Sequence, residues 1–126
     1  MQKKTYQYHE SAYKKMKEKG ICCWQKLLSP KNRDIDLQAE KFLKEVFSMK
    51  WFPSEGKVIE LGCGTAPILR YVCKKGFKGV GVDVSKTAIE MAKEQTSEKK
   101  IEFKNMDVCS NKMEKLGKFD AAIDGH

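Results

Sequence analysis

The chain has 126 residues, the length of one domain, and 25 Lys and Arg against 17 Asp and Glu give it a net charge of +8. No apolar run approaches the ~20 residues of a membrane span, and no signal-peptide pattern opens the chain, so we expect a cytoplasmic protein with no membrane partner. Five cysteines without a Cys-x-x-Cys pair, and two histidines near the termini, argue against a disulfide framework, a metal site or a Cys/His nucleophile. Reduced, mostly buried thiols are expected instead.

Residues 1–34 are expected to form a basic, helical leader or lid. Seven lysines and two glutamates fall within the first thirty residues. Apolar and aromatic residues recur at roughly helical spacing on either side of Gly20, which predicts two helical pieces. A positive segment of this kind can attract nucleic acid, but without arginine clusters a solvated lysine face is the favoured interpretation.

Residues 35–126 are expected to form the main domain, which opens with an amphipathic helix in DIDLQAEKFLKEVFSMKWF, residues 34–52. Asp34 or Asp36 can act as its N-cap. The predicted apolar stripe consists of Ile35, Ala39, Phe42, Leu43, Val46 and Phe47.

Short apolar runs then alternate with helical patterns. Strands are predicted at residues 57–61, 79–83, 101–106 and 119–124. The intervening helices are expected in PILRYVCKKG, with proline in the first turn and Gly76 as C-cap, and in KTAIEMAKEQ, with Ser85 as N-cap. This order indicates an α/β fold with a Rossmann-like parallel sheet of about four strands and flanking helices.

A glycine-rich loop, in VIELGCGTAP, follows the first of these strands. Gly62 and Gly64 lack a Cβ, so the backbone can turn tightly there and approach a ligand closely. Asp83 ends the next strand about 20 residues later, where an acidic residue can accept hydrogen bonds from ribose hydroxyls; its alternative role is to cap the helix after Ser85. Together these features predict a site for a nucleoside, in either a nicotinamide dinucleotide or S-adenosylmethionine.

Three features favour S-adenosylmethionine over a dinucleotide. Pro67 occupies the position of the third glycine of the dinucleotide fingerprint. Glu60, just before the loop, would repel a pyrophosphate but could hold a cationic amino-acid group. A mostly helical leader of some 55 residues also precedes the first strand, whereas dinucleotide domains commonly begin with that strand.

The motifs VIELGCGTAP, GVGVDVS, NMDV and FDAAID, in this order, resemble the class I S-adenosylmethionine-dependent methyltransferases over roughly residues 57–126. The resemblance implies that Glu60 reaches the amino group of the cofactor's methionine part, directly or through water. It also implies that Gly62, Cys63 and Gly64 line that part with their backbone. The third glycine usual in that family is Ala66 here, which leaves less clearance.

The same resemblance assigns the nucleoside end of the cofactor. Asp83 would hold the ribose and Val84 would pack on the adenine. Asp107 would accept from the adenine amine, with the Val108 amide near a ring nitrogen. Asp124 would lie where the cofactor and acceptor sites meet.

The implied activity is methyl transfer from S-adenosylmethionine, with S-adenosylhomocysteine as product, to a nitrogen or oxygen of a small molecule or a protein. Within the class, the run GVGVDVSKTAIEMAK followed by FDAAIDGH looks most like small methyltransferases that act on small molecules or on protein lysines. The protein-lysine branch typically continues its fourth strand as Asp-Lys-Gly-Thr, and this chain has Asp-Gly-His. The protein-lysine substrate is therefore not carried over.

Candidate catalytic and cofactor-facing residues are few. Asp124 is the first candidate for orienting or deprotonating the acceptor, and a structural role at the end of its strand is an equally favoured alternative. His126 is a weaker candidate for a base. Cys63 has no histidine nearby in sequence and is interpreted as a loop-lining residue. Trp24 and the tyrosines of the leader could cover the sulfonium by a cation–π contact, although core packing is favoured.

The class I fold has seven strands, so the predicted sheet is incomplete and the chain is expected to be a fragment that carries mainly the cofactor-binding half. Its fourth strand would expose a pairing edge, through which two copies could form a homodimer. Whether this length is active is left open. Two other functions remain as alternatives: an NAD-dependent oxidoreductase domain, and a non-catalytic basic module that binds nucleic acid.

Overall fold

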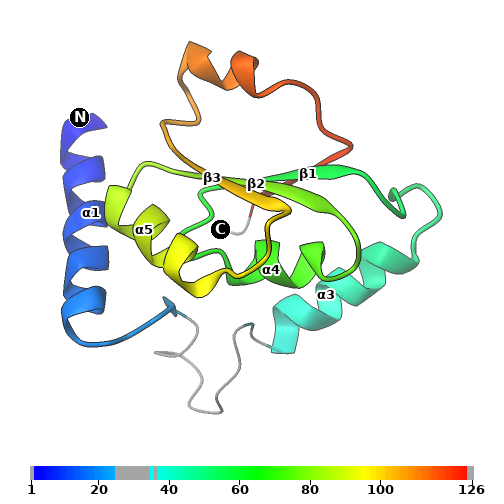
Figure 1. Ribbon diagram of the computed structural model, residues 1–126, viewed down its shortest axis with the longest axis horizontal. Helices are drawn as coiled ribbons and strands as arrows, with labels where there is room; N and C mark the ends of the chain where they lie inside the picture. Colours follow the sequence, from blue (N-terminus) through cyan, green and yellow to red (C-terminus); the bar gives the residue numbers. More distant parts are fainter. Residues whose placement is uncertain (1, 25–34, 36, 125–126) are drawn as a thin grey trace.

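The computed structural model describes residues 2–24, 35 and 37–124 of the chain (Figure 1). Its helices are α1 (Gln2–Glu18), α3 (Leu37–Ser48), α4 (Pro67–Cys73) and α5 (Lys86–Gln95), with one 3-10 segment, η1 (Asn111–Leu116). Its strands are β1 (Lys57–Leu61), β2 (Lys78–Asp83), β3 (Ile101–Asn105) and β4 (Ala121–Asp124). None of the described helices combines the length and apolar character needed to cross a bilayer.

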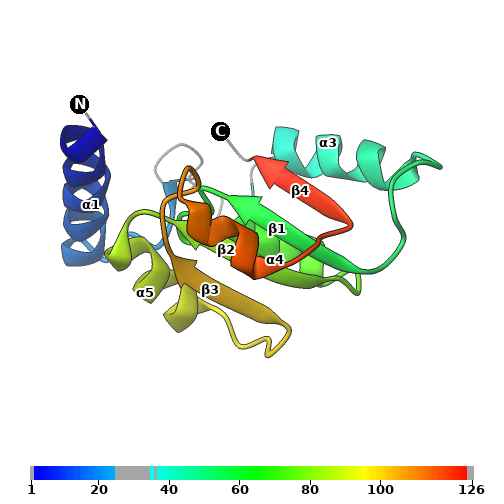
Figure 2. The same ribbon diagram turned by 90° about the horizontal axis from the view of Figure 1, so that it is seen from above.

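The four strands form one parallel sheet, as the sequence predicts, and the structure gives their order as β3-β2-β1-β4 (Figure 2). The register pairs Leu61 at the end of β1 with Val82 on one side and with Asp124 on the other. The carboxyl ends of β1, β2 and β4 therefore meet at one edge of the sheet. This edge is where open parallel sheets bind ligands.

Alternation along the strands divides the apolar residues between the two faces of the sheet. Val58 faces the larger core, which α3, α4 and α5 cover, whereas Ile59 faces a smaller cluster that includes Met113 and Leu116 of η1. Figure 1 shows the three helices on one side of the sheet and η1 on the other. The fold is thus a three-layer arrangement with one thinly covered face.

Helix ends follow the local sequence closely. Ser85 is the N-cap of α5, and its Oγ accepts a hydrogen bond of 3.0 Å from the amide of Ala88. Pro67 begins α4 as predicted, but α4 ends at Cys73 with Lys74 as its C-cap, so Gly76 is not the cap residue. α1 ends before Gly20, which has a φ of 68°. The second predicted helical piece of the leader lies largely outside the described residues.

The predicted apolar stripe of α3 is wrong at one position. Leu43 is buried, and Ala39 and Phe47 pack against the same core, but Phe42 is 63% exposed. Residues 39, 43 and 47 are spaced by four and so form a narrow face, which places residue 42 about 100° away from its centre. The N-cap predicted at Asp34 or Asp36 falls outside the described residues.

Candidate functional site

A cavity of about 470 Å³ opens at the carboxyl ends of β1, β2 and β4. All of the site residues predicted from the sequence line it except Asp107. One wall comes from α1, which the glycine-loop motifs do not reveal. The residues that line the cavity are Tyr8, His9, Ala12, Tyr13, Trp24, Glu60, Leu61, Gly62, Cys63, Gly64, Thr65, Pro67, Ile68, Asp83, Val84, Val108 and Asp124.

The loop between β1 and α4 has alternating left-handed residues. Gly62, Gly64 and Ala66 have φ values of 64°, 55° and 62°. Ala66 stands where the third glycine was expected, and it adopts the conformation that a glycine would adopt. Because a Cβ makes this conformation unfavourable by about 1–2 kcal/mol, the surrounding packing must hold Ala66 in place. The loop is therefore a fixed backbone cradle rather than an adaptable turn.

Asp83 joins this loop to the start of α5. Its Oδ2 accepts a hydrogen bond of 2.8 Å from the Gly64 amide, and its Oδ1 accepts one of 2.8 Å from the Ser85 amide. The side chain is 7% exposed and borders the cavity. Each carboxylate oxygen can accept a second hydrogen bond, so this structural role leaves capacity for a ligand hydroxyl.

Glu60 is a buried carboxyl group at the floor of the site. It is 2% exposed, and its Oε2 accepts a hydrogen bond of 3.1 Å from the Leu69 amide. Burial raises the pKa of Glu60 to about 8, and the Leu69 bond and the Arg70 charge only partly offset that effect. A carboxyl group in this state would gain strongly from a cationic ligand group, which would stabilise its ionised form.

Cys63 lines the cavity, but its thiol is packed and buried. A Cβ on Gly81 of β2 would lie 2.9 Å from the Cys63 sulfur, so this sulfur is packed against the sheet. The residue is 4% exposed, and burial raises the pKa of its thiol well above the ordinary range. These observations agree with its interpretation as a loop-lining residue.

The residues predicted to hold the adenine lie on two neighbouring loops. Val84 and Val108 border the cavity, and Val108 is 41% exposed. Asp107 does not line the cavity. Its Oδ2 accepts a hydrogen bond from the Tyr6 hydroxyl of α1, and its Oδ1 accepts one of 2.9 Å from the Cys109 amide. The Tyr6 hydrogen bond is the main reason that the pKa of Asp107 is lowered.

The last strand supplies the remaining predicted residue. Asp124, the final residue of β4, is exposed and lines the cavity beside Leu61, its partner in β1. His126 lies outside the described residues.

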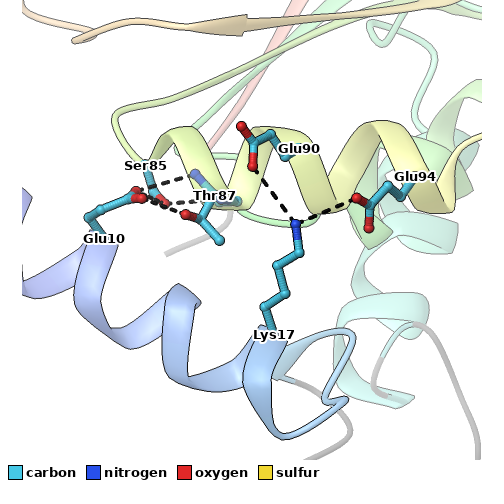
Figure 3. Close-up of polar contacts among 7 residues, drawn as sticks. Glu10, Lys17, Ser85, Thr87, Glu90 and Glu94 are labelled. Atoms are coloured by element: carbon cyan, nitrogen blue, oxygen red, sulfur yellow. Dashed lines mark hydrogen bonds and ion pairs between the residues drawn. The ribbon is translucent and has the colours of Figure 1, made fainter.

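α1 is docked on α5 by polar groups, as Figure 3 shows. Glu10 accepts hydrogen bonds from the Ser85 hydroxyl at 2.6 Å and from the Thr87 amide and hydroxyl. Lys17 lies 3.8 Å from Glu90 and 3.5 Å from Glu94. Burial opposes ionisation of Glu10, but the hydrogen bonds from Ser85 and Thr87 outweigh it and lower its pKa. These contacts hold α1 against the turn that contains Asp83.

Two aromatic residues of the leader, Tyr13 and Trp24, line the cavity. Tyr13 packs with Met16 and with Ala88 of α5, and it also lines the cavity. The Trp24 indole N–H donates a hydrogen bond of 3.1 Å to the Tyr13 hydroxyl. The spacing of apolar residues in the leader predicted two helical pieces on either side of Gly20, but it did not indicate what Tyr13 and Trp24 cover.

Comparison with known proteins places the chain in a family. Residues 58–125 match the family model described as a methyltransferase domain, so the chain belongs to that family. A curated relative, the 2-heptyl-1-hydroxyquinolin-4(1H)-one methyltransferase of Mycobacteroides abscessus, is 35% identical over 71 residues, 55% of this chain and 31% of the relative. Putative methyltransferase 235L of Invertebrate iridescent virus 6 is 29% identical over 106 residues, 82% of this chain and 37% of the relative.

A solved structure supports the same fold. The TehB-like SAM-dependent methyltransferase of Corynebacterium glutamicum has a TM-score of 0.61 and 19% identity, over 92% of this chain and 55% of its own. This likeness confirms the Rossmann-like arrangement predicted from the sequence. The chain spans about a third of the length of the curated relatives it matches.

Proposed function

We propose that this chain carries the cofactor-binding portion of an S-adenosylmethionine-dependent methyltransferase, with the cavity at the strand ends as the cofactor site. Membership of the methyltransferase-domain family supports the proposal. The observation that carries it is the acidic lining of the cavity, in which Glu60 can ionise when a cation binds beside it. Glu60, Asp83 and Asp124 line the cavity, whereas its described lining contains no lysine and no arginine.

This charge distribution distinguishes the two nucleoside ligands that the motifs allow. S-adenosylmethionine carries a sulfonium and an ammonium group against one carboxylate, so its net charge is positive and an acidic cavity attracts it. A dinucleotide carries a pyrophosphate, which the acidic side chains that line the cavity would repel. The whole chain has a net charge of +8, so the acidic lining of the cavity is a local feature and does not reflect the overall composition.

Residues of the cavity fit the parts of the cofactor in order. Glu60, which is buried and lines the cavity, would receive the ammonium group. Asp83 would accept from the ribose hydroxyls while it keeps its bonds to Gly64 and Ser85. Val84 and Val108 would flank the adenine, and Asp107 could accept from the adenine amine only if its contact with Tyr6 changes or is shared.

When bound, S-adenosylmethionine supplies a methyl group for in-line transfer to an acceptor atom. The protein's part is to hold the acceptor in line and exclude water, and alignment of this kind can contribute about 7–11 kcal/mol. Asp124 lines the cavity, and in this proposal it would orient an amine or hydroxyl acceptor or take up its proton. The acceptor is a small molecule or a protein group, and the enzyme is cytoplasmic.

Isothermal titration calorimetry tests the proposal with S-adenosylhomocysteine, S-adenosylmethionine and NADH as ligands. We expect both adenosyl compounds to bind and NADH not to bind. Asp83→Ala should weaken binding at least tenfold, as loss of hydrogen bonds to ribose predicts. Glu102→Gln, an exposed change on β3 away from the cavity, is the matched control and should bind normally.

Other outcomes would identify the alternatives. NADH binding without S-adenosylhomocysteine binding would establish an oxidoreductase domain. Salt-sensitive RNA binding without any nucleoside binding would indicate the basic module. Because Asp83 also holds the loop, the melting temperature of each variant must be compared, and lost binding counts only for a variant that is folded at the titration temperature.

A further inference from the structure

The hydroxyl group of Tyr13 lies at the glycine loop, although Tyr13 belongs to α1. A Cβ built on Gly64 would lie 2.5 Å from the Tyr13 oxygen, so this oxygen occupies the space beside the Gly64 Cα. Tyr13 is 6% exposed, and its ring packs in a cluster with Met16, Ala88 and Met91. The absence of a side chain at residue 64 therefore makes room for the hydroxyl group of a residue of α1.

The Tyr13 hydroxyl is an unused donor in the part of the chain that the structure describes. Its oxygen accepts the 3.1 Å hydrogen bond from Trp24, whose indole N–H can only donate. Its own hydrogen has no acceptor among the described residues. Burial and the charge of Asp83 raise the pKa of Tyr13 to about 12, so the hydroxyl is protonated at neutral pH. Acceptance from Trp24 also makes it a stronger donor.

A ligand with an amino-acid end would need a neutral hydrogen-bond donor near the glycine loop. Its charged side chains are acidic, and its described lining has no lysine or arginine. A ligand that bears both an ammonium and a carboxylate group would place the ammonium at Glu60. Its carboxylate would then have to find hydrogen-bond donors nearby, and the loop that contains Gly64 follows Glu60 directly. A phenol can supply such a donor without cancelling the acidic charge that favours a cationic ligand.

We propose that the Tyr13 hydroxyl donates a hydrogen bond to the carboxylate of the ligand's methionine portion, which makes α1 part of the binding site. This inference rests on the proposed function, because it requires a ligand with an amino-acid end. Trp24 then acts as a positioning residue, since its indole N–H fixes the Tyr13 oxygen. Glu10 accepts hydrogen bonds from Ser85 and Thr87 and so fixes the position of α1 relative to α5, on which the Tyr13 contact depends.

The test compares two ligands on the Tyr13→Phe variant. S-adenosylhomocysteine has the amino-acid end, whereas 5′-methylthioadenosine has the same nucleoside and sulfur without it. We expect Tyr13→Phe to weaken binding of S-adenosylhomocysteine by about tenfold or more, as removal of a hydrogen bond to a charged group predicts. Binding of 5′-methylthioadenosine should stay within about twofold, because the phenylalanine ring keeps the packing and the half-exposed Trp24 can turn to water.

Met16→Leu is the matched control, because Met16 belongs to the same α1–α5 cluster but does not line the cavity. It should change the melting temperature without a preference between the two ligands. Equal affinities of wild type and Tyr13→Phe for S-adenosylhomocysteine, or equal losses for both ligands, would overturn the Tyr13 contact while leaving the proposed function intact. If the wild-type chain binds neither ligand, the proposed function is wrong and the Tyr13 inference fails with it.

Discussion

The Asp83 carboxylate accepts a hydrogen bond of 2.8 Å from the amide of Gly64, and this bond connects the two motifs that the sequence offered as one site. Its other oxygen binds the Ser85 amide at the start of α5. Asp83 therefore fixes the relative position of the glycine loop and of α5, on which α1 rests. A substitution that shifts the glycine loop, α5 or α1 should therefore change the stability or position of the other two.

Gly64→Ala should destabilise the fold for two separable reasons. The residue has a φ of 55°, and a new Cβ would lie 2.5 Å from the Tyr13 oxygen. Gly20 has a similar φ of 68° with no atom within 4 Å of a Cβ, so Gly20→Ala measures the backbone cost alone. We expect Gly20→Ala to cost about 1 kcal/mol and Gly64→Ala to cost about 1–3 kcal/mol more in chemical denaturation.

Removal of the Tyr13 hydroxyl provides the decisive comparison for this prediction. Tyr13→Phe should recover part of the stability lost in Gly64→Ala, because it removes the atom nearest the new methyl group. Strictly additive effects of the two substitutions would show that the two residues are not in contact.

Cofactor binding should depend on pH through Glu60. Because burial raises the pKa of Glu60 to about 8, the carboxyl group is largely protonated at pH 7. A bound ammonium group would lower this pKa, so binding should release a proton, and affinity should rise as the pH increases toward 8. Titrations in buffers with different ionisation enthalpies measure the proton count. A heat of binding that is the same in all buffers at pH 7 would contradict the assignment of Glu60.

The same raised pKa predicts how unliganded stability varies with pH. The folded chain binds this proton more tightly than the unfolded chain, so the contribution of Glu60 is most favourable at low pH. It declines as the pH rises from the unfolded carboxyl value toward 8, by at most about 1.4 kcal/mol per pH unit. Glu60→Gln should remove this decline, stabilise the chain above pH 8 and weaken S-adenosylhomocysteine binding. Glu102→Gln should do none of these.

α1 should detach when Glu10 can no longer accept hydrogen bonds. Glu10→Ala removes the acceptor of Ser85 and Thr87, whereas Glu18→Ala, at the exposed end of the same helix, is the control. We expect faster hydrogen exchange in α1 and weaker S-adenosylhomocysteine binding for Glu10→Ala only. Since the pKa of Glu10 is lowered, its contribution is present at neutral pH and is lost on acidification through that pKa. Unchanged exchange in α1 would show that its apolar contacts suffice.

The outer edge of β4 is proposed to pair with a second copy of the chain. β4 ends the described sheet, and exposed strand edges favour pairing. Sedimentation velocity should reveal a concentration-dependent dimer that Ala122→Lys disrupts, because a charge on an edge opposes pairing. Asn111→Lys on η1 adds the same charge away from this edge. A monomer at all concentrations, or equal effects of the two substitutions, would rule the pairing out.

Much of the fold could be predicted because the controlling interactions are local. The alternation of apolar runs with helical patterns gave all four strands, within two residues at their start and one at their end. Ser85 is a cap because its own hydroxyl reaches an amide three residues later. β1 and β2 bring Gly64 and Asp83 together because parallel strands end at a common edge. Phe42 was wrongly predicted to be buried because helical periodicity indicates which side of α3 faces the core but not how wide the buried face is.

The wall formed by α1 was decided by tertiary structure alone. Tyr13 lies against Gly64 across 51 positions of sequence, and Glu10 binds Ser85 across 75. The sequence shows that α1 has an apolar face, but a helix can dock such a face at many positions with similar burial. The choice among them depends on matching surfaces and on specific hydrogen bonds, which exist only once the sheet and α5 have formed. The sequence alone thus determined the glycine loop and the acidic residues beside it, whereas the tertiary structure decided that α1 forms a wall of the cavity.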